Sequence, residues 1–174
     1  MNNSEILDVV DKENKLVGTA SRGEIHIQGL YHRSVAIWVF RGEDILLQQR
    51  GQGVEVGSGL WDLSTAGHVK QGEPYLVAAK RELKEETGLN GHSLRVIRKH
   101  HLWHYKYPNG LIDNEMMMTF RCGMDGEIRK DGGELKELKY FPVSKVKKWV
   151  ESRPEEFTPW FLEEWSYLLG KEVV

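Results

Sequence analysis

Three glutamates within five residues form the most distinctive chemical group in the sequence. Glu82, Glu85 and Glu86 lie in the run RELKEE at positions 81–86. On a helix these carboxylates stand at i, i+3 and i+4, so they leave one face. Like charges at this spacing repel, and a purely structural helix gains nothing from them. A hard divalent cation such as Mg²⁺ takes oxygen ligands and bridges to phosphates, so it would turn the repulsion into binding.

The surrounding residues extend this pattern into a longer signature. Residues 67–89 are Gly67, five residues, Glu73, seven residues, and then Arg-Glu-apolar-x-Glu-Glu-x-Gly-apolar. This segment, called the box below, resembles the complete signature of the Nudix hydrolases. The resemblance implies hydrolysis of a diphosphate joined to an organic group X, on an α/β/α sandwich around a mixed β-sheet. A solvated helix face is the alternative for any single glutamate, but the complete pattern argues against it.

The resemblance also implies roles for the matching residues. Arg81 would orient the acidic cluster through a bidentate pair, and Glu73 would support the site. The metal would be Mg²⁺, with Mn²⁺ as a substitute, and would lower the pKa of a bound water. Glu85 is the preferred general base, with another box carboxylate or a glutamate outside the box as alternatives. The implied metal ligands are three carboxylates and one main-chain carbonyl: Glu82, Glu85, Glu86 and Gly67.

Length and composition fit one soluble domain over residues 1–174. The chain has 174 residues, of which 40% are hydrophobic, and its net charge of −2 favours neither a nucleic-acid polymer nor a membrane as partner. Its one cysteine, Cys122, cannot form an internal disulfide, which suits a reducing cytosol. No signal-peptide region and no membrane-spanning apolar run is visible. We therefore expect a cytoplasmic domain acting on a small diphosphate, with the oligomeric state left open, a homodimer included.

The pattern of apolar residues predicts a mixed α/β (α+β) architecture. A hairpin is expected over 6–20, and the core of the domain over roughly 30–165. Within the box, a helix is expected between Pro74 and Gly88, with Leu76, Ala79 and Leu83 as the apolar stripe that packs on the sheet. The other expected elements are strands at 33–41, 45–49, 94–105, 115–122 and 138–141, and helices at 143–151 and 158–170.

Outside the box, the chain resembles the branch of the superfamily that includes type I isopentenyl-diphosphate isomerase. The matching segments are LLQQR at 46–50, WDLSTAGH at 61–68, DNE at 113–115 and FTPW at 157–160. In that isomerase a catalytic cysteine precedes the Gly-His pair, whereas this chain has Ala66. A methyl group cannot move a proton, so the acid–base pair of the isomerase is broken. The isomerase also lacks the complete box, and both departures indicate a hydrolase on an isomerase-like scaffold.

This second resemblance indicates further candidate residues for substrate binding. Arg50 stands at the end of a strand, where it would hold a substrate phosphate or remain a surface charge. Trp61 would cover the X group or belong to the core.

Histidines supply the remaining candidates. His68 and Glu115 are candidate substrate-binding residues, and with His26 and His32 they match a second metal site of the isomerase. The alternative is that each histidine is an ordinary hydrogen-bonded polar residue. The imidazole-rich strand at 100–105 would form a pocket wall or pack in the usual way.

Three functions are compatible with these patterns. The preferred one is Mg²⁺-dependent hydrolysis of a small nucleoside diphosphate or other X-diphosphate. The alternatives are isopentenyl-diphosphate isomerase-like activity and a non-catalytic nucleotide sensor that regulates a partner. Such sensors usually carry a degraded box and an added DNA-binding domain, whereas the box here is complete. The sequence does not name X, because specificity lies in loops outside the box.

Overall fold

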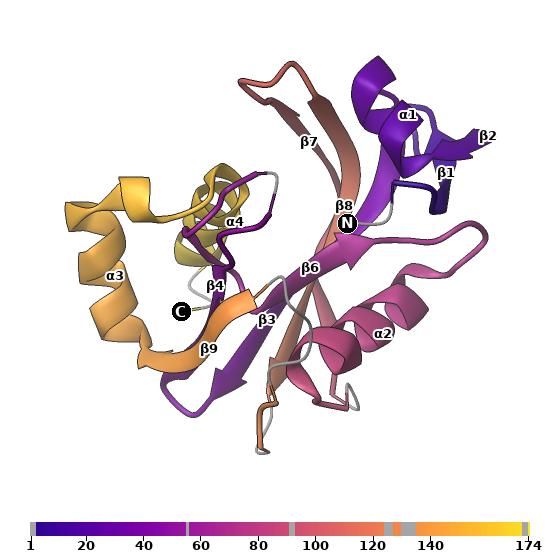
Figure 1. Cartoon of the computed structure of the whole chain (residues 1–174). Coiled ribbons are helices and arrows are strands. Elements are labelled where there is room, and N and C mark those ends of the chain that lie inside the picture. Colours follow the sequence, from indigo (N-terminus) through magenta and orange to yellow (C-terminus); the bar gives the residue numbers. More distant parts are fainter. Residues whose placement is uncertain (1–2, 55, 91–92, 124–126, 130–134, 172–173) are drawn as a thin grey trace.

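The chain folds into a nine-stranded mixed β-sheet with four α-helices in the part that the structure describes (Figure 1). The structure is a computed structural model, and it describes residues 3–54, 56–90, 93–123, 127–129, 135–171 and 174. None of the helices in these ranges is long and apolar enough to span a bilayer. The elements in chain order are β1 (Ile6–Val10), β2 (Leu16–Ser21), α1 (Arg22–Gln28), β3 (Tyr31–Arg41), β4 (Asp44–Arg50), β5 (Trp61–Asp62), β6 (Thr65–His68), α2 (Tyr75–Thr87), β7 (Arg95–Lys106), β8 (Ile112–Gly123), β9 (Leu135–Pro142), α3 (Val143–Ser152), the 3₁₀ turn η1 (Pro154–Glu156) and α4 (Pro159–Gly170).

Strand β3 is the axis of the sheet. It pairs antiparallel with β1, β4 and β6, and parallel with β8. Strand β2 extends the sheet beyond β1, β7 extends it beyond β8, and β4 also pairs with β5 and β9. A parallel pair needs a long crossover, which the chain between β3 and β8 supplies. The register of this pair sets His32 opposite Glu115.

The two faces of the sheet carry separate apolar cores, because side chains alternate along β3. Ile37 and Val39 belong to one core together with Leu83 of α2. Trp38 belongs to the other core, where its ring centroid lies 5.3 Å from that of Phe161 on α4. Figure 1 shows α2 on one side of the sheet and α3 and α4 on the other. The expected sandwich of helices around a mixed sheet is therefore confirmed.

Helix α2 carries the box glutamates and ends where the sequence predicts. Gly88 has φ +73°, and its N–H donates to the carbonyl of Lys84 over 3.0 Å, a left-handed C-cap that favours glycine. The buried face includes Ala79 and Leu83, as predicted. The prediction was wrong for Leu76, which is 44% exposed. Tyr75 packs against the core at this end instead, and its hydroxyl donates to the carbonyl of Met116 over 3.0 Å.

Helix α1 is an element that the sequence interpretation missed. Ser21 is its N-cap and forms a capping box with Glu24, in which each side chain accepts from the other residue's backbone N–H. Gly29 closes the helix with φ +64°. The S-x-x-E spacing at 21–24 was the available signal. The helix matters because it carries Arg22 and His26 into the site described below.

A buried ionic network fastens α4 to the sheet. Glu164 is fully buried and accepts hydrogen bonds from Arg98 and Thr119, each over 2.7 Å. His101 Nε2 lies 2.9 Å from the same carboxylate. Since removing one partner would leave a buried charge unpaired, this network fixes the position of α4 against β7 and β8.

Candidate active site

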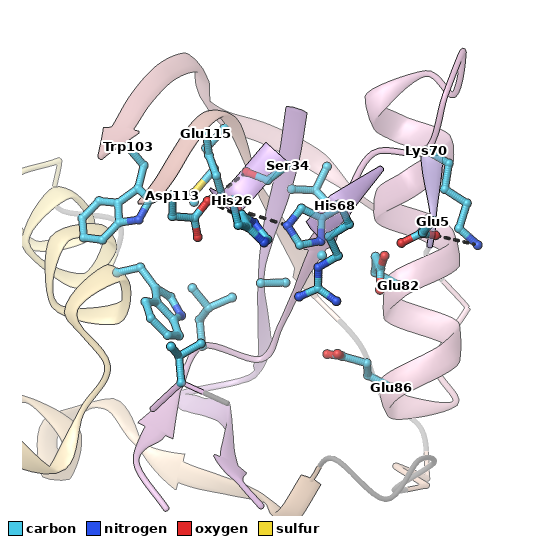
Figure 2. Close-up of a pocket in the computed structure, with 18 of the residues that line it drawn as sticks. Glu5, His26, Ser34, His68, Lys70, Glu82, Glu86, Trp103, Asp113 and Glu115 are labelled. Carbon is cyan, nitrogen blue, oxygen red and sulfur yellow. Dashed lines mark hydrogen bonds and ion pairs between the residues drawn. The ribbon is translucent and has the colours of Figure 1, made fainter. Parts of the chain in front are cut away.

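A cavity of about 310 Å³ lies between α2, β6, α1 and β8 (Figure 2). Carboxylates of the box line one end of it, and an imidazole–carboxylate cluster lines another part. The structure brings together eight of the predicted site residues in this cavity: Arg50, Gly67, His68, Arg81, Glu82, Glu85, Glu86 and Glu115. Trp61 and Glu73 do not line it.

Arg81 organises the acidic end of the cavity. Its Nε and Nη2 donate to the two carboxylate oxygens of Glu73 over 3.0 and 2.8 Å, a bidentate pair. Its Nη1 donates to Glu82 over 2.6 Å and to Glu85 over 3.3 Å. Its Nη2 also donates to the main-chain carbonyl of His68 over 3.0 Å. One guanidinium therefore orients the box helix against strand β6, and Glu73 acts behind the site by holding Arg81.

Glu82 and Glu86 are half-buried and less exposed than Glu85, the third carboxylate on this face of α2. Burial raises the pKa of Glu82 to about 7 and that of Glu86 to about 8. Oε2 of Glu86 is buried and makes no hydrogen bond within the described part of the chain. Glu85 differs, because its side chain is 56% exposed. An unsatisfied buried carboxylate oxygen beside further carboxylates fits a hard divalent cation, which would supply the missing partner.

Gly67 is required by the close approach of Glu82. A Cβ at position 67 would lie 2.2 Å from Cδ of Glu82, far inside van der Waals contact. The absence of a side chain thus lets the Glu82 carboxylate rest against the backbone of β6. This places the main chain of Gly67 beside the box carboxylates, as the family signature implies for a metal-binding carbonyl.

A second cluster, of side chains whose types could bind a metal, lies at the same cavity, and all of its members except His32 line it. His26 comes from α1, His32 from β3, His68 from β6, and Asp113 and Glu115 from β8. The three Nε2 atoms and Oδ1 of Asp113 are buried and make no hydrogen bond among the described residues. The Nε2 atoms lie 3.6–3.8 Å from the nearest carboxylate oxygens. These nitrogen and oxygen atoms are separated by distances typical of ligands that each lie about 2 Å from one shared ion.

The protonation states of this cluster also suit a metal. Burial lowers the pKa of His26 and of His32 to about 4, and that of His68 well below its usual value. The imidazoles are therefore neutral near pH 7, which is the form that binds metals. Imidazoles with carboxylates are typical ligands of transition-metal ions, whereas the all-oxygen box suits Mg²⁺.

Arg50 lies in the cavity wall and is not a surface charge. Its side chain is only 18% exposed, and its Nε donates to the carbonyl of Val56 over 3.0 Å. Its Nη1 lies 3.4 Å from Oδ2 of Asp62, and its guanidinium carbon lies 5.3 Å from the ring centroid of Trp160. Asp62 also accepts hydrogen bonds from Thr158 over 3.0 Å and from Trp160 over 2.8 Å. This buried carboxylate therefore positions both a cation and an aromatic ring at the cavity.

Comparison with known proteins places this geometry in a family. The family model of the NUDIX domain matches residues 30–161. The chain belongs to the Nudix family. The isopentenyl-diphosphate Delta-isomerase 2 of Photorhabdus laumondii is 32% identical over 177 residues, which cover 95% of this chain and 99% of that protein. Nudix hydrolase 3 of Arabidopsis thaliana is 41% identical over 88 residues, which cover 49% of this chain and 11% of that protein.

Solved structures share the fold of this Nudix chain. A protein of Deinococcus radiodurans superposes with a TM-score of 0.66 at 16% identity, over 85% of this chain and 90% of that one. The MutT protein of Methanosarcina mazei superposes with a TM-score of 0.61 at 18% identity, over 82% and 94% of the two chains. At these identities, the likeness shows the Nudix fold and nothing finer.

The Nudix cavity differs from the sequence interpretation at Trp61. Residues 61 and 62 point to opposite faces of β5, so Asp62 faces Arg50 while Trp61 packs in the core. The ring of Trp61 lies edge-to-face on Phe141, with centroids 5.1 Å apart. The structure therefore does not bring Trp61 to this cavity.

Three aromatic rings and two cations that the interpretation did not select line the Nudix cavity: Trp103, Tyr107, Trp160, Arg22 and Lys70. Trp103 lies on the imidazole-rich strand at 100–105, for which the sequence left a pocket wall and ordinary packing open. Trp160 lies in the FTPW segment, which was a further available signal. Arg22 has no distinguishing spacing of its own, and only the position of α1 places it here.

Proposed function

We propose that this protein catalyses metal-dependent hydrolysis of the diphosphate linkage in a small X-diphosphate. The observation that carries the proposal is the pair of half-buried carboxylates Glu82 and Glu86 at one end of the cavity. Arg81 and Gly67 position Glu82, and Oε2 of Glu86 is buried without a hydrogen bond among the described residues. A cavity of about 310 Å³ is at the lower end of the range for small-molecule sites, which favours a compact X group over a polymer.

In the proposed reaction, water attacks a phosphorus atom, the bridging P–O bond breaks, and two phosphate-bearing products leave. Glu82, Glu85 and Glu86, with the carbonyl of Gly67, would hold Mg²⁺ or Mn²⁺. The ion would offset phosphate charge and acidify the water. Glu85 is our assignment for the carboxylate that accepts the proton, because it lies at the cavity and its side chain is exposed.

Cations of the cavity wall would orient the substrate. Arg50 is held by Asp62, and its guanidinium is a suitable donor for the terminal phosphate. Arg22 enters from α1 and lines the same cavity. Both would bind phosphate oxygens, which would keep the reacting phosphorus in line with the attacking water.

We further propose that the cluster of His26, His32, His68, Asp113 and Glu115 holds a second divalent ion. The support is the set of buried, unpaired nitrogen and oxygen atoms that converge there. The ligand types favour a transition metal such as Mn²⁺ or Zn²⁺.

A substrate screen tests the proposed hydrolysis. Nucleoside diphosphates, nucleotide sugars and prenyl diphosphates are incubated with the protein and Mg²⁺, and released phosphate or monophosphate is measured. Turnover should disappear with excess EDTA and return when Mg²⁺ is added. Undiminished turnover in EDTA, or no turnover of any diphosphate with Mg²⁺ or Mn²⁺ present, would contradict the proposal.

Isomerisation of an isoprenoid diphosphate is the second candidate, favoured by the name of the Photorhabdus relative and by the histidine cluster. Against it, Ala66 lines the cavity with a methyl group, where an isomerase needs a group that moves a proton. Isopentenyl diphosphate incubated with the protein, metal and heavy water should therefore acquire no deuterium. Deuterated dimethylallyl diphosphate in the product would replace the hydrolase assignment.

A further inference from the structure

A second groove, of about 530 Å³, lies between β9, α3 and η1. Its floor consists of three aromatic rings, Trp61, Phe141 and Trp149, which contact one another edge-to-face with centroids 5.1–5.5 Å apart. Trp61 and Phe141 are almost fully buried, whereas Trp149 is half-buried. The exposed part of the floor is therefore mainly the Trp149 ring. Its Nε1 donates to Glu156 over 2.7 Å, which fixes its orientation.

The rim of this groove carries an excess of positive charge. Four cations line it, Lys139, Lys145, Lys148 and Arg153, against two carboxylates, Glu137 and Glu156.

Both carboxylates already have partners. Glu137 lies 3.9 Å from Lys139, and Glu156 accepts a hydrogen bond from Arg153 over 2.9 Å. No ion pair joins Lys145 or Lys148 to a carboxylate in the ranges that the structure describes. Two ammonium groups are thus available for an anion.

The lysines are held over the aromatic floor. Nζ of Lys145 lies 5.3 Å and Nζ of Lys139 lies 5.6 Å from the ring centroid of Phe141, both within the range of a cation–π contact. Both ammonium groups therefore lie at the groove while remaining exposed to solvent, and Lys148 lines the same groove. An anion bound there would lie beside the Trp149 ring.

This groove is separate from the Nudix cavity. The two sites share no lining residue among those described. Strand β5 divides them, since Trp61 lies on the groove floor and Asp62 binds Arg50 on the cavity side. A ligand of the groove would therefore bind without touching the box or the histidine cluster.

We propose that the β9–α3 groove is a second binding site, for a small anion that carries a flat ring, such as a nucleoside monophosphate. The ring would pack against Trp149, because aromatic surfaces stack on bases without regard to sequence. The phosphate would bind Lys145 and Lys148. The volume suits a ligand of this size.

Equilibrium dialysis with AMP in the presence of EDTA tests this proposal. Adenosine and ribose 5-phosphate, which each lack one half of the ligand, are compared with AMP. We expect saturable binding of AMP, at least tenfold tighter than either fragment. Lys145→Ala combined with Lys148→Ala should weaken AMP binding at least tenfold. Both side chains are exposed, so the melting temperature should not change.

Two control variants make the outcome decisive. Lys147→Ala removes a lysine from the same helix that does not line the groove, and it should leave AMP binding unchanged. Glu86→Gln alters the Nudix cavity and should also leave AMP binding unchanged. The proposal is overturned by absence of saturable binding, by binding that survives the double lysine variant, or by binding that Glu86→Gln abolishes. The last result would assign AMP to the Nudix cavity.

Discussion

The two candidate metal sites of this molecule are built in opposite ways. The box site takes its carboxylates from one helix, α2, together with the adjacent strand β6. The histidine cluster takes five side chains from α1, β3, β6 and β8. Both lie in one cavity, and β6 joins them, because Gly67 contacts Glu82 while the next residue, His68, belongs to the cluster.

The two sites also differ in electrostatics. Burial raises the pKa values of Glu82 and Glu86, so without metal the box tends to hold protons near neutral pH. Burial lowers the pKa values of the three histidines, so they are already in the ligand form. Metal binding at the box must therefore release protons, whereas the imidazoles bind without doing so. Burial also raises the pKa values of Asp113 and Glu115, so a metal bound at the cluster would displace protons from its carboxyls but not from its imidazoles.

The largest expected effect separates the two sites by activity. Glu86→Gln keeps the shape of the side chain but removes a carboxylate that we propose as a metal ligand. The hydrolysis rate should fall by at least ~10³, about 4 kcal/mol of transition-state stabilisation. Folding should survive, because the metal-free Glu86 is largely protonated near pH 7. Steady-state kinetics with a substrate from the screen measures the effect, with Glu151→Gln on α3 as the matched control. Near-wild-type turnover by Glu86→Gln would remove the box from the mechanism.

Gly67→Ala tests the contact between the box and β6. The added methyl group would meet Glu82 at 2.2 Å, so the carboxylate has to move. Since a misplacement of about 1 Å can cost ~10²-fold in rate, we expect kcat/KM to fall by roughly that factor. Gly18→Ala in β2 is the control, because its Cβ would meet no atom within 4 Å. Equal activity of both variants would show that the close approach has no catalytic role.

His26→Gln tests the histidine cluster alone, because α1 contributes no residue to the box. Loss of a direct ligand should lower the affinity of the cluster for a transition metal at least about 10²-fold, since the loss of an outer-shell partner already lowers metal affinity 10- to 100-fold. Hydrolysis should fall less than in Glu86→Gln. Metal content after dialysis against a weak chelator measures the loss. His100→Gln, which alters an imidazole outside the cavity, should retain the metal. Full metal retention by His26→Gln would contradict the site.

The smallest expected effect concerns how the stability of the folded protein depends on pH when EDTA removes metal. The box carboxyls and the histidines should change this stability in opposite directions. The folded protein holds protons on Glu82 and Glu86 more tightly than the unfolded chain does. Their contribution to stability is therefore lost as pH rises from about 4.5 to 8. His26 and His32 act oppositely, because the unfolded chain binds their protons more tightly, so stability rises between about pH 4 and 6.5.

Of the carboxyl and histidine contributions, only that of the carboxyls still changes with pH between 6.5 and 8. The melting temperature should therefore fall by a few degrees over this range. Glu86→Gln should flatten this decline, whereas His26→Gln should alter the slope only below pH 6.5. Scanning calorimetry from pH 4 to 8 gives both slopes. A melting temperature that rises between pH 6.5 and 8 without metal would show that the box carboxyls are not buried as described.

The fold class and the candidate box residues could be predicted from local patterns in the sequence. Glu82, Glu85 and Glu86 share a helical face because helix geometry fixes the direction of residues three and four apart. Pro74 and Gly88 bound that helix through local backbone preferences. The alternation along β3 and the positions of α2, α3 and α4 follow from equally local patterns. Each of these features depends on residues that are near one another in the chain.

The contacts between residues far apart in the sequence could not be predicted in this way, because they depend on how the elements pack together. His26, His68 and Glu115 line one cavity, with His32 buried beside them, because β3 pairs with β6 and β8 and because α1 packs next to these strands. No local rule sets that register. The positions of the Trp61 and Trp160 side chains could not be predicted from the sequence either. The direction of each side chain depends on how β5 and α4 lie against the sheet. The spacing of residues along the chain determines which side chains share one face of a helix or strand. The pairing and packing of the elements determine which other side chains that face contacts.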